Sequence, residues 1–264
     1  MVIDFHTHFY PDKIVDKAMR TAREVAHITP HASGTRDGLI ASMRKAGIDL
    51  AVGLPLVTHP GNGSGLIRWA ARCDAPPVKM LGSVHPRDPE YLATLDAAVA
   101  AGFPGIKVHP EYQDFSFDET ALDPVWDAVA ERGLFLMTHA GADSGFPPPW
   151  HSDPASLRRL HLRHPGLTLV LAHGGSWNMW DAVERELAGL PVYADLAFVT
   201  ETLAPEKVRH LIHAVGVERC LFGTDSPWCD QADALRNVRE LRLGTYAEEM
   251  ILGGNAAKLL KLAV

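Results

Sequence analysis

Short apolar stretches rich in β-branched and aromatic residues recur along the whole chain and alternate with longer amphipathic stretches. The short stretches favour strands because they are brief and are bounded by Gly, Pro and polar residues. In the intervening segments, such as 89–102 and 123–133, apolar residues are spaced three and four apart, which is typical of helices that bury one face. The eight predicted strands span residues 2–8, 49–57, 78–84, 105–110, 134–141, 167–175, 191–197 and 220–228.

Strands that alternate with helices predict a parallel sheet, because each helix returns the chain to the same end of the sheet. Eight such units in 264 residues fit one α/β domain over residues 1–264, a (β/α)8 TIM barrel, since these barrels run to roughly 250 residues. An open doubly wound sheet is the alternative. It is disfavoured because no Gly-x-Gly-x-x-Gly follows the first strand. No linker, low-complexity segment or internal repeat divides the chain.

Three Asp-Pro pairs lie where predicted helices begin. An aspartate before a helix can cap its first N–H groups, and proline suits the first turn. We therefore expect helix starts at Asp88-Pro89, Asp123-Pro124 and Asp153-Pro154.

Composition narrows the classes of partner. A net charge of -7 argues against a broad nucleic-acid or anionic-membrane surface. Three cysteines without a Cys-x-x-Cys pair indicate reduced thiols in a cytosolic protein. No run of about 18 apolar residues could span a bilayer, and Asp4 interrupts any signal-like start. We expect a cytoplasmic protein that acts on a small molecule, with a homo-oligomer left open.

Polar groups with metal-binding or catalytic chemistry gather at the ends of predicted strands. Reactive groups in a barrel belong at these C-terminal ends. One histidine there is more often structural than functional, but several on different strands favour a shared site. The strand ends carry six of the 14 histidines together with Lys107 and Asp225; the six are His6, His8, His85, His109, His139 and His173.

Alternation of side chains along a strand predicts which neighbours share a face with each group. The small Gly223, in phase with Asp225, would leave room inside the barrel. If these faces point inward, four strands bring several imidazoles and one carboxylate to one volume, a ligand set that suits zinc, iron or manganese. The predicted face-sharing neighbours are Asp4 for His6 and His8, Met137 for His139, Leu171 for His173 and Gly223 for Asp225.

Six motifs, in order, resemble the amidohydrolase superfamily over essentially the whole chain. Within it they are most similar to the amidohydrolase-related branch that includes aminocarboxymuconate semialdehyde decarboxylase and lactone hydrolases. The resemblance implies a metal-dependent TIM-barrel enzyme. The motifs are DFHTH, GIKVHP, MTHAG, LAHGG, FGTDSPW and the terminal ILGGNAAKLL.

Site roles follow from this resemblance. It implies that His173 faces the substrate. In binuclear relatives that histidine holds a second metal, which a modified lysine or a glutamate on strand four helps to bridge. Lys107 lies below the end of that strand, with His109 at the exposed position, so one ion is favoured over two. Zinc is the first expectation, with iron or manganese as alternatives. The implied metal ligands are His6, His8, His139 and Asp225, and the substrate-binding candidates are Lys107, His109, Glu111 and Trp228.

The main functional hypothesis is hydrolysis of a small amide, lactone or ester by metal-activated water. Asp225 would act as general acid and base, and His173 would polarise the substrate. The alternative is a metal-dependent non-oxidative decarboxylase of a small unsaturated or aromatic acid. It needs a cation for the substrate carboxylate, for which Arg87 and Lys107 are candidates. A phosphoesterase or DNase ranks third because of the acidic balance, and a non-enzymatic metal-binding barrel stays open.

Overall fold

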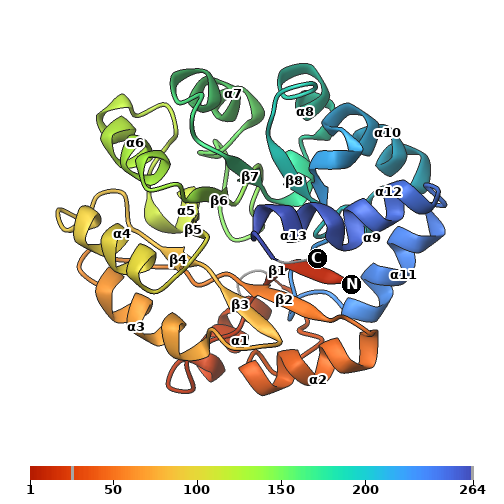
Figure 1. Cartoon of the computed structure of the whole chain (residues 1–264), viewed down its shortest axis with the longest axis horizontal. Helices are drawn as coiled ribbons and strands as arrows, with labels where there is room; N and C mark the ends of the chain where they lie inside the picture. Colours follow the sequence, from red (N-terminus) through yellow and green to blue (C-terminus); the bar gives the residue numbers. More distant parts are fainter. Residues whose placement is uncertain (25–26, 263–264) are drawn as a thin grey trace.

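The structure, a computed structural model, describes residues 1–24 and 27–262, so the last two residues of the expected domain 1–264 lie outside it. Its strands form the inner ring seen in Figure 1, and its helices surround them. The strands are β1 (Ile3–Thr7), β2 (Leu50–Gly53), β3 (Val78–Met80), β4 (Gly82–Ser83), β5 (Gly105–Val108), β6 (Phe135–Thr138), β7 (Leu169–Leu171), β8 (Tyr193–Asp195) and β9 (Cys220–Leu221).

The helices follow the strands in alternation, as the apolar spacing predicts. None of the helices described here has the length and apolar character to cross a membrane. The helices are α1 (Val15–Glu24), α2 (Arg36–Ala46), α3 (Gly63–Cys73), α4 (Tyr91–Ala100), α5 (Pro110–Gln113), α6 (Asp123–Glu131), α7 (Pro154–Arg163), α8 (Trp180–Glu186), α9 (Val199–Thr202), α10 (Pro205–Val215), α11 (Gln231–Glu240), α12 (Thr245–Glu249) and α13 (Asn255–Leu259).

The strands close into a (β/α)8 barrel, as predicted. Parallel pairing runs from β1 to β3 and from β4 to β9. Only Leu81 separates β3 from β4, so the two form the third strand of the barrel. The N–H of Phe5 donates to the carbonyl of Phe222 (2.8 Å), and Thr7 pairs with Ser226, which joins the last strand to the first. An open sheet is thereby excluded.

Two apolar layers hold the barrel together. In the outer layer, strand residues such as Ile106 and Leu136 pack against the helices. In the inner layer, Phe5 and Met137 pack with Leu260 and the neighbouring residues of α13. Figure 1 shows α13 lying across the ring of strands beside the N-terminus, so this helix closes the N-terminal end of the barrel. The opposite end is left for the site.

The expected helix caps are only partly confirmed. Asp153 caps α7 by accepting hydrogen bonds from two backbone N–H groups of its first turn. The expected start at Asp88 is wrong, because α4 begins at Tyr91. Oδ1 of Asp88 accepts from the N–H of Glu90, just before the helix, and Oδ2 accepts from the N–H of Gly61. Asp123 is the first residue of α6 rather than its cap, and its carboxylate pairs with Arg163.

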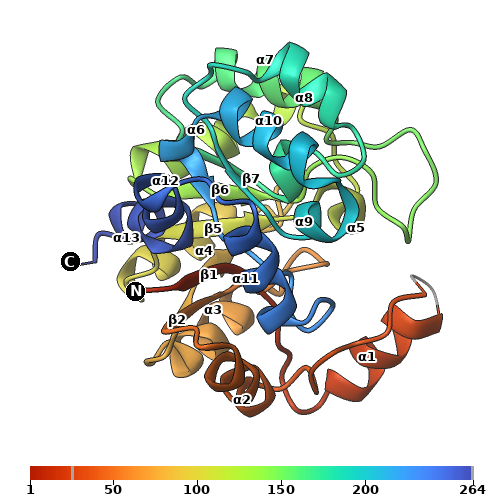
Figure 2. The same ribbon diagram turned by 90° about the vertical axis from the view of Figure 1, so that its right-hand side faces the viewer.

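The observed strands are shorter than predicted at their C-terminal ends. The predicted strand 134–141, for example, ends at Thr138. The residues beyond each strand turn over the barrel mouth instead of extending the sheet. Figure 2 shows α1 and the green loop between β6 and α7 extending on the side toward which the strands point. The candidate site lies at this end.

Candidate metal centre

A bulge in β1 brings His6 into the barrel. Asp4 pairs with Ala51 and Thr7 with Gly53, so β1 carries one residue more than β2 between these pairs. The extra residue breaks strict alternation. Phe5 packs in the inner layer and His6 still reaches the interior, whereas Asp4 accepts hydrogen bonds from Thr224 and from Gln231 of α11. The predicted common face of Asp4 and His6 is therefore wrong.

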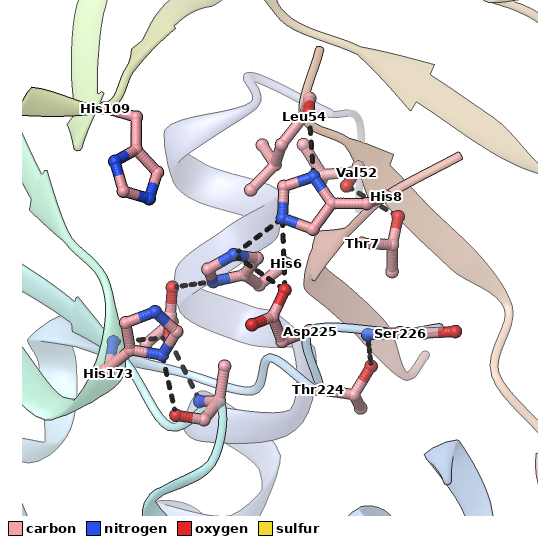
Figure 3. Close-up of polar contacts among 12 residues, drawn as sticks. His6, Thr7, His8, Val52, Leu54, His109, His173, Thr224, Asp225 and Ser226 are labelled. Atoms are coloured by element: carbon pink, nitrogen blue, oxygen red, sulfur yellow. Dashed lines mark hydrogen bonds and ion pairs between the residues drawn. The ribbon is translucent and has the colours of Figure 1, made fainter. Parts of the chain in front are cut away.

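Three ligand atoms converge at the C-terminal end of β1 (Figure 3). The Nε2 atoms of His6 and His8 are 3.2 Å apart. Oδ1 of Asp225 lies 3.1 Å from Nε2 of His8 and 3.4 Å from Nε2 of His6. Tetrahedral ligands at about 2.1 Å from a zinc ion are about 3.4 Å apart. The spacing therefore suits one ion held by all three residues.

The hydrogen bonds of the Nδ1 atoms of His6 and His8 show that the Nε2 atoms of these two rings carry lone pairs. Nδ1 of His6 faces Oδ2 of Asp195 (2.8 Å), and Nδ1 of His8 faces the carbonyl of Leu54 (2.9 Å). Both contacts require an N–H on Nδ1, which leaves Nε2 unprotonated in a neutral ring. Two lone pairs and a carboxylate oxygen then meet with no donor between them. A cation relieves this repulsion, so the residues fit a divalent metal.

The electrostatics of the ligands agree with this fit. Burial lowers the pKa of His6 well below its ordinary value, more than the carboxylate of Asp225 raises it. Burial acts to raise the pKa of Asp225, but the contacts of its carboxylate with His6 and His8 outweigh burial and hold that pKa below its usual range. A neutral imidazole and an ionised carboxylate are the forms that bind metals.

His139 lies beside the trio rather than within it. Its ring stacks on that of His109, with centroids 4.2 Å apart and planes 8° apart, and its Nε2 faces the carbonyl of Ala142 (3.0 Å). Although His109, His139 and Asp143 cluster closely, the in-plane lone pairs of parallel rings do not meet at one point. Nδ1 is the nitrogen that His139 has left for an ion at the centre. Its role as fourth ligand stays a prediction.

His173 reaches the site through a left-handed backbone conformation. Leu171, its predicted face-sharing neighbour, packs in the outer layer, so the predicted phase is wrong. A φ of 61° at His173 redirects the side chain inward, and its ring lies 5.1 Å from that of His6. Nδ1 faces the carbonyl of Ala197 (3.1 Å), so Nε2 of the neutral ring accepts hydrogen bonds. Donation to a substrate carbonyl would need the doubly protonated ring.

Gly223 opens the space in which these groups meet. A Cβ at this position would lie 2.9 Å from Cβ of His6 and 3.2 Å from Cβ of Asp195. The first distance is too short for two carbon atoms, so a side chain here would displace His6. The predicted need for a small residue below Asp225 is confirmed.

Asp195 is a functional residue that sequence reasoning missed. Its carboxylate accepts hydrogen bonds from Nδ1 of His6 and from the backbone N–H groups of His173 and Ala197. Burial raises the pKa of Asp195, more than these hydrogen bonds and nearby positive charge lower it. The available signal was an acidic residue near the end of the predicted strand 191–197.

The two candidate cations occupy different places. Lys107 is buried inside the barrel, where burial lowers its pKa to about 8, only partly offset by the carboxylates of Asp195 and Asp225. Arg87 instead pairs with Glu119 (2.8 Å) and donates to the carbonyl of Asp114. Of these two side chains, Lys107 is the one near the centre.

The remaining substrate-binding candidates lie around the mouth. Nδ1 of His109 is 3.7 Å from Oε2 of Glu111, and Oε1 of Glu111 accepts from the N–H of His151 (2.8 Å). Trp228 is half-buried, its backbone N–H donates to the carbonyl of Asp225, and its ring lies 6.4 Å from that of Tyr10. His109 thus lies beside the centre through its stacking on His139, while Glu111 contacts His109 and Trp228 follows Asp225 in the chain.

Residues 3–262 match the family model described as Amidohydrolase. This chain belongs to the amidohydrolase family. The protein is therefore an amidohydrolase-superfamily enzyme that takes a divalent metal, as its residues already indicated. No match was found among curated proteins.

Solved structures with the same fold include three decarboxylase structures. The 5-carboxyvanillate decarboxylase of Sphingomonas paucimobilis is 19% identical, with a TM-score of 0.75 and 99% of each chain covered. A 2,6-dihydroxybenzoate decarboxylase complexed with 2,6-dihydroxybenzoate is 17% identical, with a TM-score of 0.72 and 99% of each chain covered. The 5-carboxyvanillate decarboxylase of Novosphingobium aromaticivorans, complexed with manganese and 4-hydroxy-3-methoxy-5-nitrobenzoic acid, is 19% identical, with a TM-score of 0.73, and 99% of this chain and 96% of that chain are covered. At these identities the likeness shows the fold.

In this amidohydrolase, Asp195→Asn is expected to weaken metal binding about 10- to 100-fold. Asparagine retains one acceptor oxygen but loses the charge that favours the Nδ1–H form of His6. Metal affinity is measured by competition with a chromogenic chelator. The control is Asp49→Asn, at an exposed position where the carboxylate accepts from the N–H of Val2. Equal affinity in wild type and Asp195→Asn would show that Asp195 does not orient His6.

Proposed function

We propose that this amidohydrolase is a metal-dependent non-oxidative decarboxylase of a small aromatic or unsaturated acid. The observation that carries the proposal is Lys107, a buried cation that feels the negative charge of Asp195 and Asp225. Burial lowers its pKa by more than these two carboxylates raise it, so they do not fully offset the cost of burying the ammonium group. A substrate carboxylate would supply a further, direct anionic partner. The decarboxylases with the same fold support this choice over hydrolysis.

The proposed centre holds one ion on His6, His8 and Asp225, with His139 as the fourth ligand. Manganese or zinc suits two imidazoles and a carboxylate. When bound, the ion supplies Lewis acidity that polarises substrate oxygens. Asp195 and the carbonyl of Leu54 orient His6 and His8.

The residues of the chain account for the rest of the reaction. Lys107 holds the reacting carboxylate, and His173 accepts a hydrogen bond from a substrate hydroxyl through Nε2. The bond between the carboxyl carbon and the substrate breaks, carbon dioxide leaves, and the electron pair stays on the substrate carbon. Asp225, ionised in the resting centre, takes a proton from solvent and passes it to that carbon. His109, Glu111 and Trp228 line the mouth around the substrate.

Hydrolysis of a small amide, lactone or ester is the second candidate, favoured by the description of the family. It uses the same residues. Asp225 takes a proton from the attacking water and returns one to the leaving group, while His173 contacts the substrate carbonyl. This reaction brings no substrate carboxylate to Lys107, so it ranks below decarboxylation.

The proposed ligands are tested by elemental analysis of purified wild type and the double variant His6→Ala, His8→Ala. Wild type is expected to hold about one divalent ion per chain and the variant less than about a tenth of that. The identity of the ion comes from the same measurement. Circular dichroism checks that the variant is folded. Unchanged metal content in a folded variant would refute the centre.

The reaction is tested by assaying the manganese- and zinc-loaded protein on two sets of compounds. The first set contains 2,6-dihydroxybenzoate and 5-carboxyvanillate, and the second contains simple lactones, esters and amides. Release of carbon dioxide from the first set is expected. Hydrolysis in the second set without carbon dioxide from the first would instead establish the hydrolase.

A further inference from the structure

Three residues around the centre adopt left-handed backbone conformations. The φ angle is 61° at His173, 61° at Phe198 and 60° at Asp225. Histidine and aspartate are among the residues that occur there more often, and both serve the proposed centre. For a bulky residue such as phenylalanine this conformation is an outlier. Phe198 therefore needs a separate explanation.

The other left-handed positions that the structure describes are occupied by glycine or by polar residues. Among the described residues, Phe198 is the one apolar side chain of the eight non-glycine residues with positive φ. Glycine would make the same turn without strain. The turn between β8 and α9 thus does not call for phenylalanine, which points to a function for the ring.

The ring of Phe198 stands at the edge of the site. Its centroid lies 6.1 Å from that of His173 and 5.4 Å from that of Trp177, and the side chain is only half-buried. The residue before it, Ala197, accepts the hydrogen bond of His173 and donates to Asp195. One short segment therefore orients the rings of His6 and His173 and sets the position of Phe198 relative to them.

A second group of aromatic side chains lies beside His139. His109 stacks on His139, Tyr112 meets His109 edge-on at 4.7 Å, and Phe146 meets Tyr112 at 4.9 Å. The ring centroid of His139 also lies 4.9 Å from that of His173, the ring next to Phe198. Aromatic rings therefore lie next to both His173 and His139. Such faces favour a planar ring, which can stack on them or meet them edge-on.

We propose that Phe198, with Trp177 beside it, is a specificity-determining wall that packs against the ring of a planar aromatic acid. The orientation of that acid, with its carboxylate toward Lys107, rests on the proposed function. The backbone strain at Phe198 is retained because it places the ring beside His173.

Two substitutions separate this role from ordinary packing. Phe198→Gly removes the ring and the strain together, and Phe198→Tyr keeps the ring. The control is Arg242→Gly, an exposed left-handed position (φ 52°) between α11 and α12. Melting temperature is measured for each variant. Affinity is measured by calorimetry on the manganese-loaded protein, with 2,6-dihydroxybenzoate, 5-carboxyvanillate and 4-hydroxy-3-methoxy-5-nitrobenzoate as aromatic probes and cyclohexanecarboxylate as a saturated one.

Phe198→Gly is expected to raise the Kd of the aromatic probes about ten-fold and that of the saturated probe less. Its melting temperature should not fall by more than about 3 °C, because relief of strain offsets the lost contacts of a half-exposed ring. Phe198→Tyr should bind as wild type does. Arg242→Gly should leave every Kd unchanged.

Three results would overturn the assignment: an unchanged aromatic Kd in Phe198→Gly, a large loss of its melting temperature, or no binding of any aromatic probe to wild type. Failure of the proposed function has a different signature. Aromatic binding that weakens in Phe198→Gly without carbon dioxide release would support the wall and refute the decarboxylase. Carbon dioxide release together with an unchanged Kd and KM in Phe198→Gly would support the decarboxylase and refute the wall.

Discussion

Asp225→Asn is expected to lower kcat at least about a thousand-fold while the protein stays folded and keeps its metal. Asparagine has the shape of aspartate and can offer an amide oxygen where Oδ1 faces His6 and His8. It cannot carry the proton that the substrate carbon needs. Turnover is measured as carbon dioxide release, and metal content by elemental analysis of the same sample.

The matched control for this variant is Asp233→Asn, on the exposed face of α11, where the carboxylate pairs with Arg236. It should retain full activity, since exposed ion pairs contribute little. An Asp225→Asn protein with wild-type turnover would remove Asp225 from the chemistry. Loss of metal together with activity would make it a ligand without showing that it transfers a proton.

Lys107→Met is expected to have opposite effects on stability and activity. In the metal-free protein it should raise the free energy of unfolding at pH 7 by roughly 3 kcal/mol, because burial lowers the pKa of Lys107 from 10.5 to about 8. With metal bound, kcat/KM for a carboxylate substrate should fall about 100-fold, since the charge-assisted contact to the substrate is lost. Urea unfolding and steady-state kinetics measure the two effects.

The gain in stability expected for Lys107→Met depends on pH. Below pH 8 the lysine is protonated in both folded and unfolded chains, so the full cost of burying the charge is present. Between pH 8 and 10.5 the folded protein loses the proton first, and the cost disappears. The stability advantage of Lys107→Met should therefore be largest at pH 7 and shrink toward pH 10.

The control for Lys107→Met is Lys45→Met, whose side chain is 76% exposed beside Asp230. Its free energy of unfolding should stay within about 0.5 kcal/mol of wild type at both pH values. If Lys107→Met is less stable than wild type at pH 7, the carboxylates of Asp195 and Asp225 stabilise the ammonium by more than its burial costs. Lys107 would then be a structural ion partner rather than a substrate anchor.

Lys107 and Phe198 illustrate the same physical trade-off. One is a buried charge and the other a strained backbone, and each makes the folded chain less stable than a simpler residue would. Both lie next to the proposed centre. Substitution of either residue should therefore lower activity or substrate binding without lowering stability. Substitution of a purely structural residue would lower stability.

Much of this enzyme could be predicted from local sequence pattern. The alternation of short apolar strands with amphipathic helices predicted the barrel and its strand order. The same pattern placed His6, His8, Lys107, His139 and Asp225 at or near strand ends, and it put Gly223 in phase with Asp225. These features follow from periodicity along a few residues and from the rule that parallel strands end at one edge.

Tertiary structure alone decided the details that make the site work. The bulge in β1 and the left-handed turn at His173 change which side chains enter the barrel, and alternation cannot foresee either. The pairing of His6 with Asp195 joins residues 189 positions apart, and that of Asp4 with Thr224 joins residues 220 apart. Such contacts depend on closure of the barrel, which brings the first strand against the last. The sequence by itself therefore determined the fold and the chemical groups at its mouth, whereas their orientation depended on contacts that exist only in the closed barrel.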